Sequence, residues 1–487
     1  MRRLLHTPVL AAIMVFGVSG LASAQSLTDL LPELIAKAAV IAQPISPANA
    51  NIVDANAVNR SQSFLPATTL TTVPATLNAA MALQLGTFPL GPTAGTVIYS
   101  RDGVGPAMHQ MFGAAYADRG VPLGRGKVGL AMTFQNDEYS TFDGVDLNGG
   151  GVNFLFANAG PAPDLSDVLQ ETVSYRLNRK VTSFLIDYGA TSRLDVSAVV
   201  PIVQVAMDVR VSSRIVRVRS SLDNLLSCAT VPARNAGNGV PLHLCQDPHG
   251  YDNILTLGTH ITYLDLDLNG TLISQNNYGV SGKTARGIGD LQLRGKYAVI
   301  ATPSTALAAT IDLGLPTGNT DDFLGSGAVR AKPGIAWSAA VGRVSPHVNA
   351  GYTFSSGSIS AKLQTTPATL DLKVPNEINW AAGLDAAVAP RTTLVVDVIG
   401  RTVKNVQRFD TGSTIFATGA PGVPSDVAAA TDLIPNGRGD ITQAFGTIGG
   451  RINLSGSIFA NGSVMFPVTS VGLKPRTSAV FWIDYGF

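Results

Sequence analysis

The sequence is poor in charge and lacks long apolar runs. Charged residues make up 14% of the 487 residues and the formal net charge is +1, whereas soluble domains carry about 25% charged residues. A balanced charge offers no basic footprint for nucleic acid, so no nucleic-acid partner is expected. After residue 24 no stretch approaches the ~18 consecutive apolar residues of a transmembrane helix, which argues against a helical membrane protein.

Motifs of catalysis are also missing. The chain has no Gly-x-Ser-x-Gly elbow, no phosphate-binding loop with Lys and Ser or Thr, and no His-Glu-x-x-His. Only six histidines are present. We therefore predict that the protein is not an enzyme and needs no cofactor. A hydrolase whose catalytic residues meet only in space is the less favoured alternative.

The chain has two cysteines, Cys228 and Cys245. In an exported protein such a pair predicts a disulfide that closes a local loop, with two free thiols as the alternative. His243 and His249 lie close to Cys245, but this spacing is not a metal-binding pattern. No metal site is expected.

What the sequence does have is alternation, most clearly at its carboxyl end. Every second residue from 479 to 487 is apolar, and a period of two marks one face of a β-strand. A last strand that ends on an aromatic residue suits the closing strand of a lipid-facing barrel. It resembles the assembly signal of bacterial outer-membrane proteins, which implies contact with the barrel-assembly machinery. The signal residues are Phe481, Ile483, Tyr485 and Phe487.

The amino end predicts export. A basic head at Arg2 and Arg3 precedes an apolar run at 10–18, and the small residues Ala22, Ser23 and Ala24 form a cleavage site. We interpret residues 1–24 as a signal peptide, with an uncleaved anchor as the alternative. Both ends together predict the outer membrane of a Gram-negative bacterium.

Residues 127–487 show the rhythm of a transmembrane barrel. Such a barrel alternates short periplasmic turns with long outer loops, on strands of about 9–11 residues. Low charge and abundant glycine also fit a secreted β-sandwich or β-helix, but neither explains this loop asymmetry. We predict an all-β, closed antiparallel barrel of about twelve strands, or fourteen if 254–273 adds a hairpin. The strands are expected at 127–134, 171–188, 193–211, 289–299, 306–315, 329–341, 346–354, 377–388, 392–403, 441–454, 457–468 and 478–487. Long loops are expected at 212–286, 355–374 and 404–440.

Residues 25–126 differ from the rest. Ser26 precedes a helical pattern that includes Leu30 and Leu34, whereas 49–75 reads as irregular chain. This segment is either a periplasmic extension or a plug that enters the lumen. We favour the plug, because lumen-facing polar side chains need partners.

Four short stretches carry a family resemblance. They are YGATSRLDV at 188–196, PIV at 201–203, GIGDL at 287–291 and LPTG at 315–318, in this order. Together the chain resembles, over 127–487, the outer-membrane barrels named for the MetA pathway of phenol degradation. More distantly it is similar to FadL-type channels, although it lacks their Asn-Pro-Ala hatch motif. The resemblance implies a transporter of hydrophobic compounds.

The strand pattern places one set of polar and aromatic residues in the lumen. Arg294 would lie opposite or diagonal to Asp312, where opposite charges stabilise a strand pair by ~0.2–1 kcal/mol. These side chains would either form a selective constriction or neutralise one another and anchor the plug, and mixed signs favour the latter. Trp482 would more often pack against a plug than stack a solute, and His347 would more often be a hydrogen-bonded wall residue than a ligand. The predicted lumen residues are Asp290, Gln292, Arg294, Lys296, Asp312, His347, Glu377, Asp385, Arg401 and Trp482.

These observations lead to one main hypothesis. The chain would be an outer-membrane channel for passive uptake of small hydrophobic or aromatic solutes, with membrane lipid and the solute as its partners. The alternative is a structural or surface-interaction barrel without specific transport.

Overall fold

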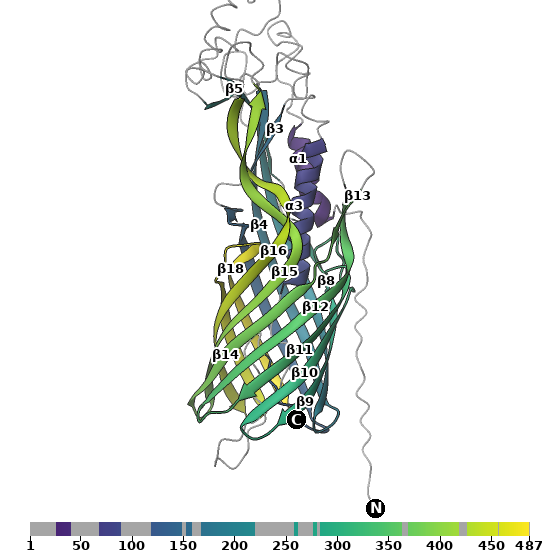
Figure 1. Ribbon diagram of the computed structural model, residues 1–487, viewed down its shortest axis with the longest axis vertical. Helices are drawn as coiled ribbons and strands as arrows, with labels where there is room; N and C mark the ends of the chain where they lie inside the picture. The colour runs from purple at the N-terminus through teal and green to yellow at the C-terminus, as the bar shows by residue number, and fades with distance from the viewer. Residues whose placement is uncertain are drawn as a thin grey trace, which may run out of the picture.

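The fold is a single antiparallel sheet closed into a barrel (Figure 1). The computed structural model describes residues 26–39, 68–88, 118–148, 152–157, 167–219, 258–261, 276–279, 283–362, 369–417, 426–455 and 457–486. The predicted disulfide of Cys228 and Cys245, the signal peptide and Phe487 lie outside these residues.

Twelve strands form the wall, as predicted. The first, β1, pairs with both β4 and the last strand, β18, which closes the sheet. One wall strand consists of two segments, β8 and β9, which pair in succession with β5. The wall comprises β1 (Val128–Phe142), β4 (Asp167–Gly189), β5 (Leu194–Arg219), β8 (Lys283–Ile288) with β9 (Leu291–Ala301), β10 (Thr305–Leu315), β11 (Ala328–Ala339), β12 (Val344–Lys362), β14 (Glu377–Ala389), β15 (Thr392–Ala417), β16 (Asp426–Ser455), β17 (Ile458–Pro467) and β18 (Leu473–Gly486).

Several wall strands are much longer than a bilayer requires. β4 has 23 residues, β5 and β15 have 26 each, and β16 has 30, against the ~9–11 of a spanning strand. The prediction of a loop over 404–440 is therefore wrong, because β15 and β16 stay paired as far as Ala417 and Asp426. Beyond the barrel these strands form a twisted projection at the end opposite the carboxyl terminus (Figure 1).

Among the described residues, five short strands lie at the same, projecting end of the barrel. They are β2 (Val145–Asp146), β3 (Val152–Ala157), β6 (Gly258–Ile261), β7 (Asn276–Gly279) and β13 (Thr369–Lys373). β6 falls in the range that could have supplied two further spanning strands. It pairs instead with the far end of β5, where Arg219 faces Gly258. The described part of that range therefore adds nothing to the twelve-strand wall.

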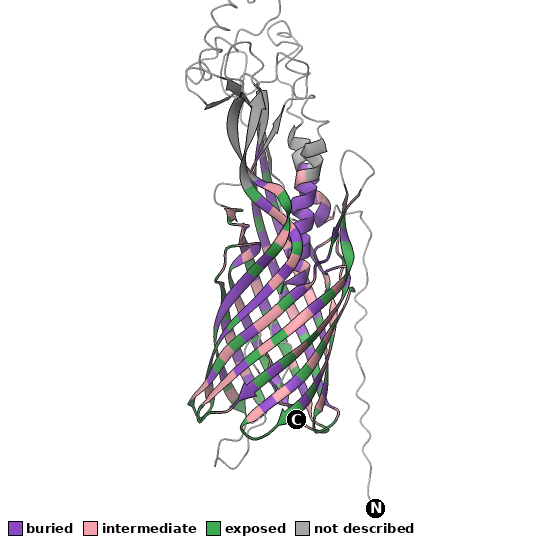
Figure 2. Cartoon of the chain, in the orientation of Figure 1, coloured by how far each residue is buried: buried purple, intermediate pink, exposed green. Residues whose placement is uncertain are grey.

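The outer face of the wall is apolar. Side chains alternate between exposed and buried along each strand (Figure 2), and the exposed set is rich in large apolar residues such as Phe134, Ile335 and Phe481. Tyr188, Tyr297 and Tyr485 lie on this face near the short turns, where their partners are Val128, Leu194 and Leu130. Aromatic residues at this level suit the interface between lipid and water.

Two helices lie at the mouth of the barrel at the projecting end (Figure 1). The first, α1 (Leu27–Ala39), begins as predicted after Ser26, whose Oγ accepts a hydrogen bond from the Asp29 N–H at 3.2 Å. Such a cap satisfies one of the free N–H groups of the first turn. Neither described helix is long and apolar enough to cross a membrane.

The second helix, α3 (Thr68–Thr87), corrects the expectation of irregular chain over 49–75, since it begins at Thr68. Its buried side chains, from Ala75 to Leu85, are mostly apolar on every side, as expected for a helix enclosed by protein. The Asn78 side chain donates to the carbonyls of Leu27 and Thr28, which fastens the two helices together. A continuous apolar core joins both helices to wall residues such as Tyr175 and Met207.

Candidate functional site

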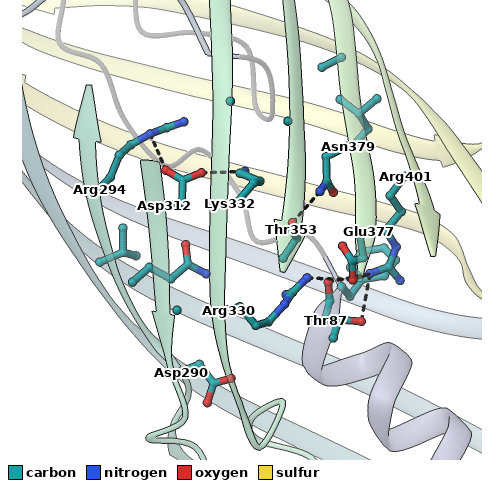
Figure 3. A pocket seen from close by; sticks show the side chains of 18 of the residues that line it. Thr87, Asp290, Arg294, Asp312, Arg330, Lys332, Thr353, Glu377, Asn379 and Arg401 are labelled. Atoms are coloured by element: carbon teal, nitrogen blue, oxygen red, sulfur yellow. Dashed lines mark hydrogen bonds and ion pairs between the residues drawn. The ribbon is translucent and has the colours of Figure 1, made fainter. Parts of the chain in front are cut away.

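The inward face of the wall is polar and carries paired charges. Asp312 of β10 lies directly opposite Arg294 of β9, and Arg294 Nε is 2.8 Å from Asp312 Oδ1. Lys332 of β11 approaches the other oxygen of Asp312 at 2.7 Å (Figure 3). Arg294 also reaches Asp118, from the segment before β1, at 3.0 Å. The opposite charges therefore neutralise one another in this group.

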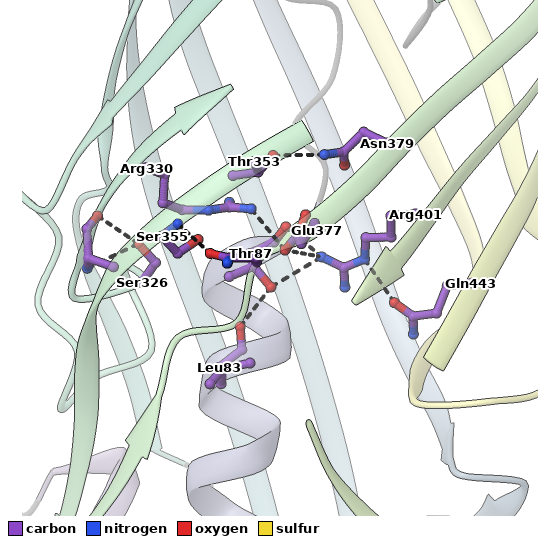
Figure 4. Close-up of polar contacts among 12 residues, drawn as sticks. Leu83, Thr87, Ser326, Arg330, Thr353, Ser355, Glu377, Asn379, Arg401 and Gln443 are labelled. Carbon is purple, nitrogen blue, oxygen red and sulfur yellow. Dashed lines mark hydrogen bonds and ion pairs between the residues drawn. The ribbon is translucent and has the colours of Figure 1, made fainter. Parts of the chain in front are cut away.

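A second charged group lies at the inner end of α3. Glu377 of β14 forms an ion pair with Arg330 at 2.8 Å, and the same carboxylate oxygen lies 3.6 Å from Arg401 Nη1. Arg401 donates to the carbonyl of Thr87 at 2.7 Å and to its hydroxyl at 3.1 Å, and its Nε donates to Gln443 (Figure 4). The C-terminal carbonyls of a helix carry partial negative charge, so a buried arginine is a favourable cap for them.

Two further contacts hold the same end of α3. Arg179 of β4 donates to the Leu85 carbonyl at 2.9 Å, while Asp137 of β1 binds the Arg179 guanidinium through two hydrogen bonds of 2.8 and 3.0 Å. Gln84 accepts from the backbone N–H of Leu473 at 2.6 Å. The tip of α3 is thus bound to strands on different sides of the wall.

Phe88, the residue after α3, is enclosed by aromatic rings and guanidinium groups. Its ring meets Tyr139 and Phe445 edge-on, with centroids at 5.7 and 5.4 Å. The guanidinium carbons of Arg179 and Arg401 lie 4.9 and 5.7 Å from its centroid. We call Tyr139, Arg179, Arg401 and Phe445 the Phe88 box.

The segment before β1 also lies inside the wall. The Asp118 N–H and carbonyl both bind the Asn349 side chain at 2.8 Å, Arg119 forms an ion pair with Asp385, and the Leu123 N–H donates to Asp195 at 2.8 Å. A Cβ placed on Gly120 would lie 2.6 Å from the Ala306 carbonyl oxygen. Only glycine therefore fits this close passage along the wall.

Between these groups lies a cavity of about 250 Å³. Its charged lining includes both signs, and its apolar lining includes three phenylalanines. The lining includes Phe88, Arg179, Asp312, Phe323, Arg401 and Phe445.

The remaining predicted residues take separate places. Asp290 lines the cavity. Its carboxylate accepts hydrogen bonds from the N–H groups of Gly318 and Ser326 and so holds the connection between β10 and β11. Gln292 lines the cavity. Lys296 is buried, and its Nζ lies 3.6 Å from Asp195 Oδ2.

His347 and Asp385 form part of one buried group. His347 Nε2 is 2.9 Å from Asp397, and its Nδ1 is 3.9 Å from Asp385. Trp482 is also inward and packs beside Val480. These three residues do not line the cavity.

The Phe88 box was not identified from the sequence. Alternation along β4, with Tyr175 and Leu177 on the same face, could have placed Arg179 in the lumen. Its partner at the tip of α3 could not be inferred, because residues 94 positions apart meet there.

The comparisons agree with the resemblance drawn from the short motifs. Residues 240–391 match the family model described as "Putative MetA-pathway of phenol degradation", which confirms the resemblance for less than a third of the chain. No curated protein sequence matches the chain.

Solved outer-membrane barrels are similar to the chain at low identity. An outer membrane channel from Pseudomonas putida F1 is 12% identical, with a TM-score of 0.39 over 77% of this chain and 100% of that one. The toluene transporter TbuX of Ralstonia pickettii is 12% identical, with a TM-score of 0.31 over 75% and 90%. A FadL homologue of Pseudomonas aeruginosa is 12% identical, with a TM-score of 0.29 over 74% and 90%.

The geometry of the wall indicates the cellular location of the protein. A closed barrel leaves no unpaired sheet edge, and its exposed face is apolar, which is the form in which β-strands span a membrane. Antiparallel barrels with an even number of strands and an apolar outer band are the form taken by bacterial outer-membrane proteins, so the chain is an integral protein of the cell outer membrane.

Proposed function

We propose that the chain is a channel for passive uptake of small aromatic or hydrophobic solutes across the outer membrane. The observation that carries this proposal is the cavity of about 250 Å³ inside the closed wall, lined by Phe88, Phe323 and Phe445 beside paired charges. An apolar cavity of about 150 Å³ is enough to hold benzene. The space therefore suits a solute of one aromatic ring.

The paired charges argue against an ion-selective pore. Selectivity for one sign of ion usually comes from a ring of like charges, whereas the charges of Arg294 and Lys332 are balanced here by Asp312 and Asp118. Flux would follow the solute gradient without an energy source. The alternative of a surface-interaction barrel has one observation in its favour, the long projection of β4, β5, β15 and β16.

The proposal predicts that an aromatic solute obstructs the lumen. In single-channel recordings of the purified protein, phenol should reduce the residual ion current in a concentration-dependent way. Glucose at the same concentrations should leave the current unchanged, because it has no aromatic ring for the phenylalanine side chains of the lining to bind. Equal effects of the two solutes would argue against an aromatic preference, and no effect of either solute would favour the surface-interaction alternative.

A further inference from the structure

Phe88 occupies a site that is built to hold one aromatic ring. Its ring is bordered by two aromatic edges, from Tyr139 of β1 and Phe445 of β16. Arg179 of β4 and Arg401 of β15 approach it with their guanidinium groups. Edge-on aromatic pairs and cations near a ring face are both specific attractions for a π system. Four wall strands thus supply the contacts of this single ring.

The box also contains polar atoms that Phe88 cannot satisfy. The Tyr139 hydroxyl and Arg401 Nη2 are buried and have no hydrogen-bond partner within the described part of the chain. Tyr139 is 0% exposed and Arg401 2%. A buried polar group without a partner is unfavourable, and a phenyl ring offers it none. A ring that carries an oxygen could accept from Arg401 and bind the tyrosine hydroxyl.

The Phe88 box can be reached from the cavity inside the barrel. Arg179, Arg401 and Phe445 line the central cavity, and so does Phe88 itself. The box therefore borders the space in which the proposed solute would travel.

We propose that the Phe88 box is a binding site for a single aromatic ring bearing an oxygen, and that Phe88 occupies it until such a solute displaces it. Phe88 would then be an internal competitor that occupies the binding site in place of the solute. Displacement frees the tip of α3 from its aromatic contacts, so solute binding and movement of the plug are coupled. The inference rests on the proposed function and names the solute class and the place where it binds.

The test is the substitution Phe88→Ala, which empties the box. Titration calorimetry with phenol on the detergent-solubilised full chain should show at least roughly tenfold tighter binding to F88A than to the unaltered protein, because the internal competitor is gone. Phe142→Ala is the matched control. Phe142 is also buried, and its edge-on ring contact, with centroids at 5.3 Å, is with Phe409 and not with a residue of the Phe88 box, so F142A should bind phenol no better than the unaltered protein.

A second variant distinguishes hydrogen bonding to the solute from the simple gain of volume in the Phe88 box. In the F88A background, Tyr139→Phe should reduce the preference for phenol over toluene roughly tenfold, because the hydroxyl partner is lost. Heat-modifiable migration in gels shows that each variant is folded. No gain in phenol affinity in F88A, or an equal gain for toluene that Y139F does not alter, would overturn the inference.

Binding to purified protein does not depend on transport. If the unaltered chain carries phenol while F88A gains no affinity, the inference fails and the proposed function stands. If F88A binds phenol tightly but the unaltered chain carries no phenol, the inference stands and the proposed function fails.

Discussion

Deletion of residues 26–117 should raise the single-channel conductance roughly tenfold or more, since eight strands already enclose an interior that side chains just fill and twelve enclose a wider one. In the intact chain α3 and its tip occupy this space, bound to Arg179 and Arg401. Planar-bilayer recordings of the refolded variant measure the change. Heat-modifiable migration should remain, because every wall strand is retained.

A smaller deletion is the matched control. Removal of residues 26–39 takes away α1 but leaves the tip of α3 bound to the wall, so conductance should change little. Unchanged conductance in the larger deletion would contradict the role of α3 as the barrier and favour a segment that only rests on the barrel.

The second large effect is expected for Asp137→Ala. Asp137 is fully buried and makes two hydrogen bonds to Arg179, which is also buried. Removal of one partner of a buried ion pair leaves an uncompensated charge and costs about 3–5 kcal/mol. We expect the free energy of unfolding, measured by guanidinium titration in lipid vesicles, to fall by about this amount.

Two variants control for the cause. Asp137→Leu combined with Arg179→Met removes both charges and should recover most of the lost stability, because apolar side chains can replace a buried pair. Asp440→Ala removes an exposed carboxylate that pairs with Lys404 and should have no measurable effect. A loss of stability in the double variant as large as in D137A would show that the uncompensated charge is not responsible.

The wall could be predicted from sequence because one physical rule governs it. A side chain faces either hydrocarbon or the interior, so alternation shows both the strand and its orientation. The predicted strand at 306–315 is β10 (Thr305–Leu315), and the hairpin brings Arg294 opposite Asp312. The sequence rule weakens where the strands leave the membrane, because their outer face meets water there. For this reason the sequence predicts a loop where β15 and β16 continue as a pair.

The interior contacts could not be predicted in the same way. Arg401 was predicted to face the lumen, but its contact with Thr87 joins residues 314 positions apart. Asp290 is an even number of residues from Arg294, so alternation predicts that both side chains lie on the same face of the strand. Asp290 nevertheless binds Ser326, because it lies at the break between β8 and β9. Local periodicity gives the direction of a side chain but not its partner.

The two ends of the interior differ in chemistry. At the projecting end, α1 and α3 join the wall in an apolar core. Toward the short turns, the segment from Asp118 to Leu123 meets paired charges. The cavity lies where these regions meet, and its lining combines both. A solute with an apolar ring and a polar group matches this combination better than an ion or a sugar does.

Uptake of labelled phenol into proteoliposomes that contain the unaltered full chain tests the central claim most directly. The account predicts entry much faster than into protein-free vesicles of the same lipid, ending at equal concentrations inside and outside, with labelled glucose entering far more slowly. Phenol entry no faster than through protein-free lipid, measured with correctly folded protein, would contradict it.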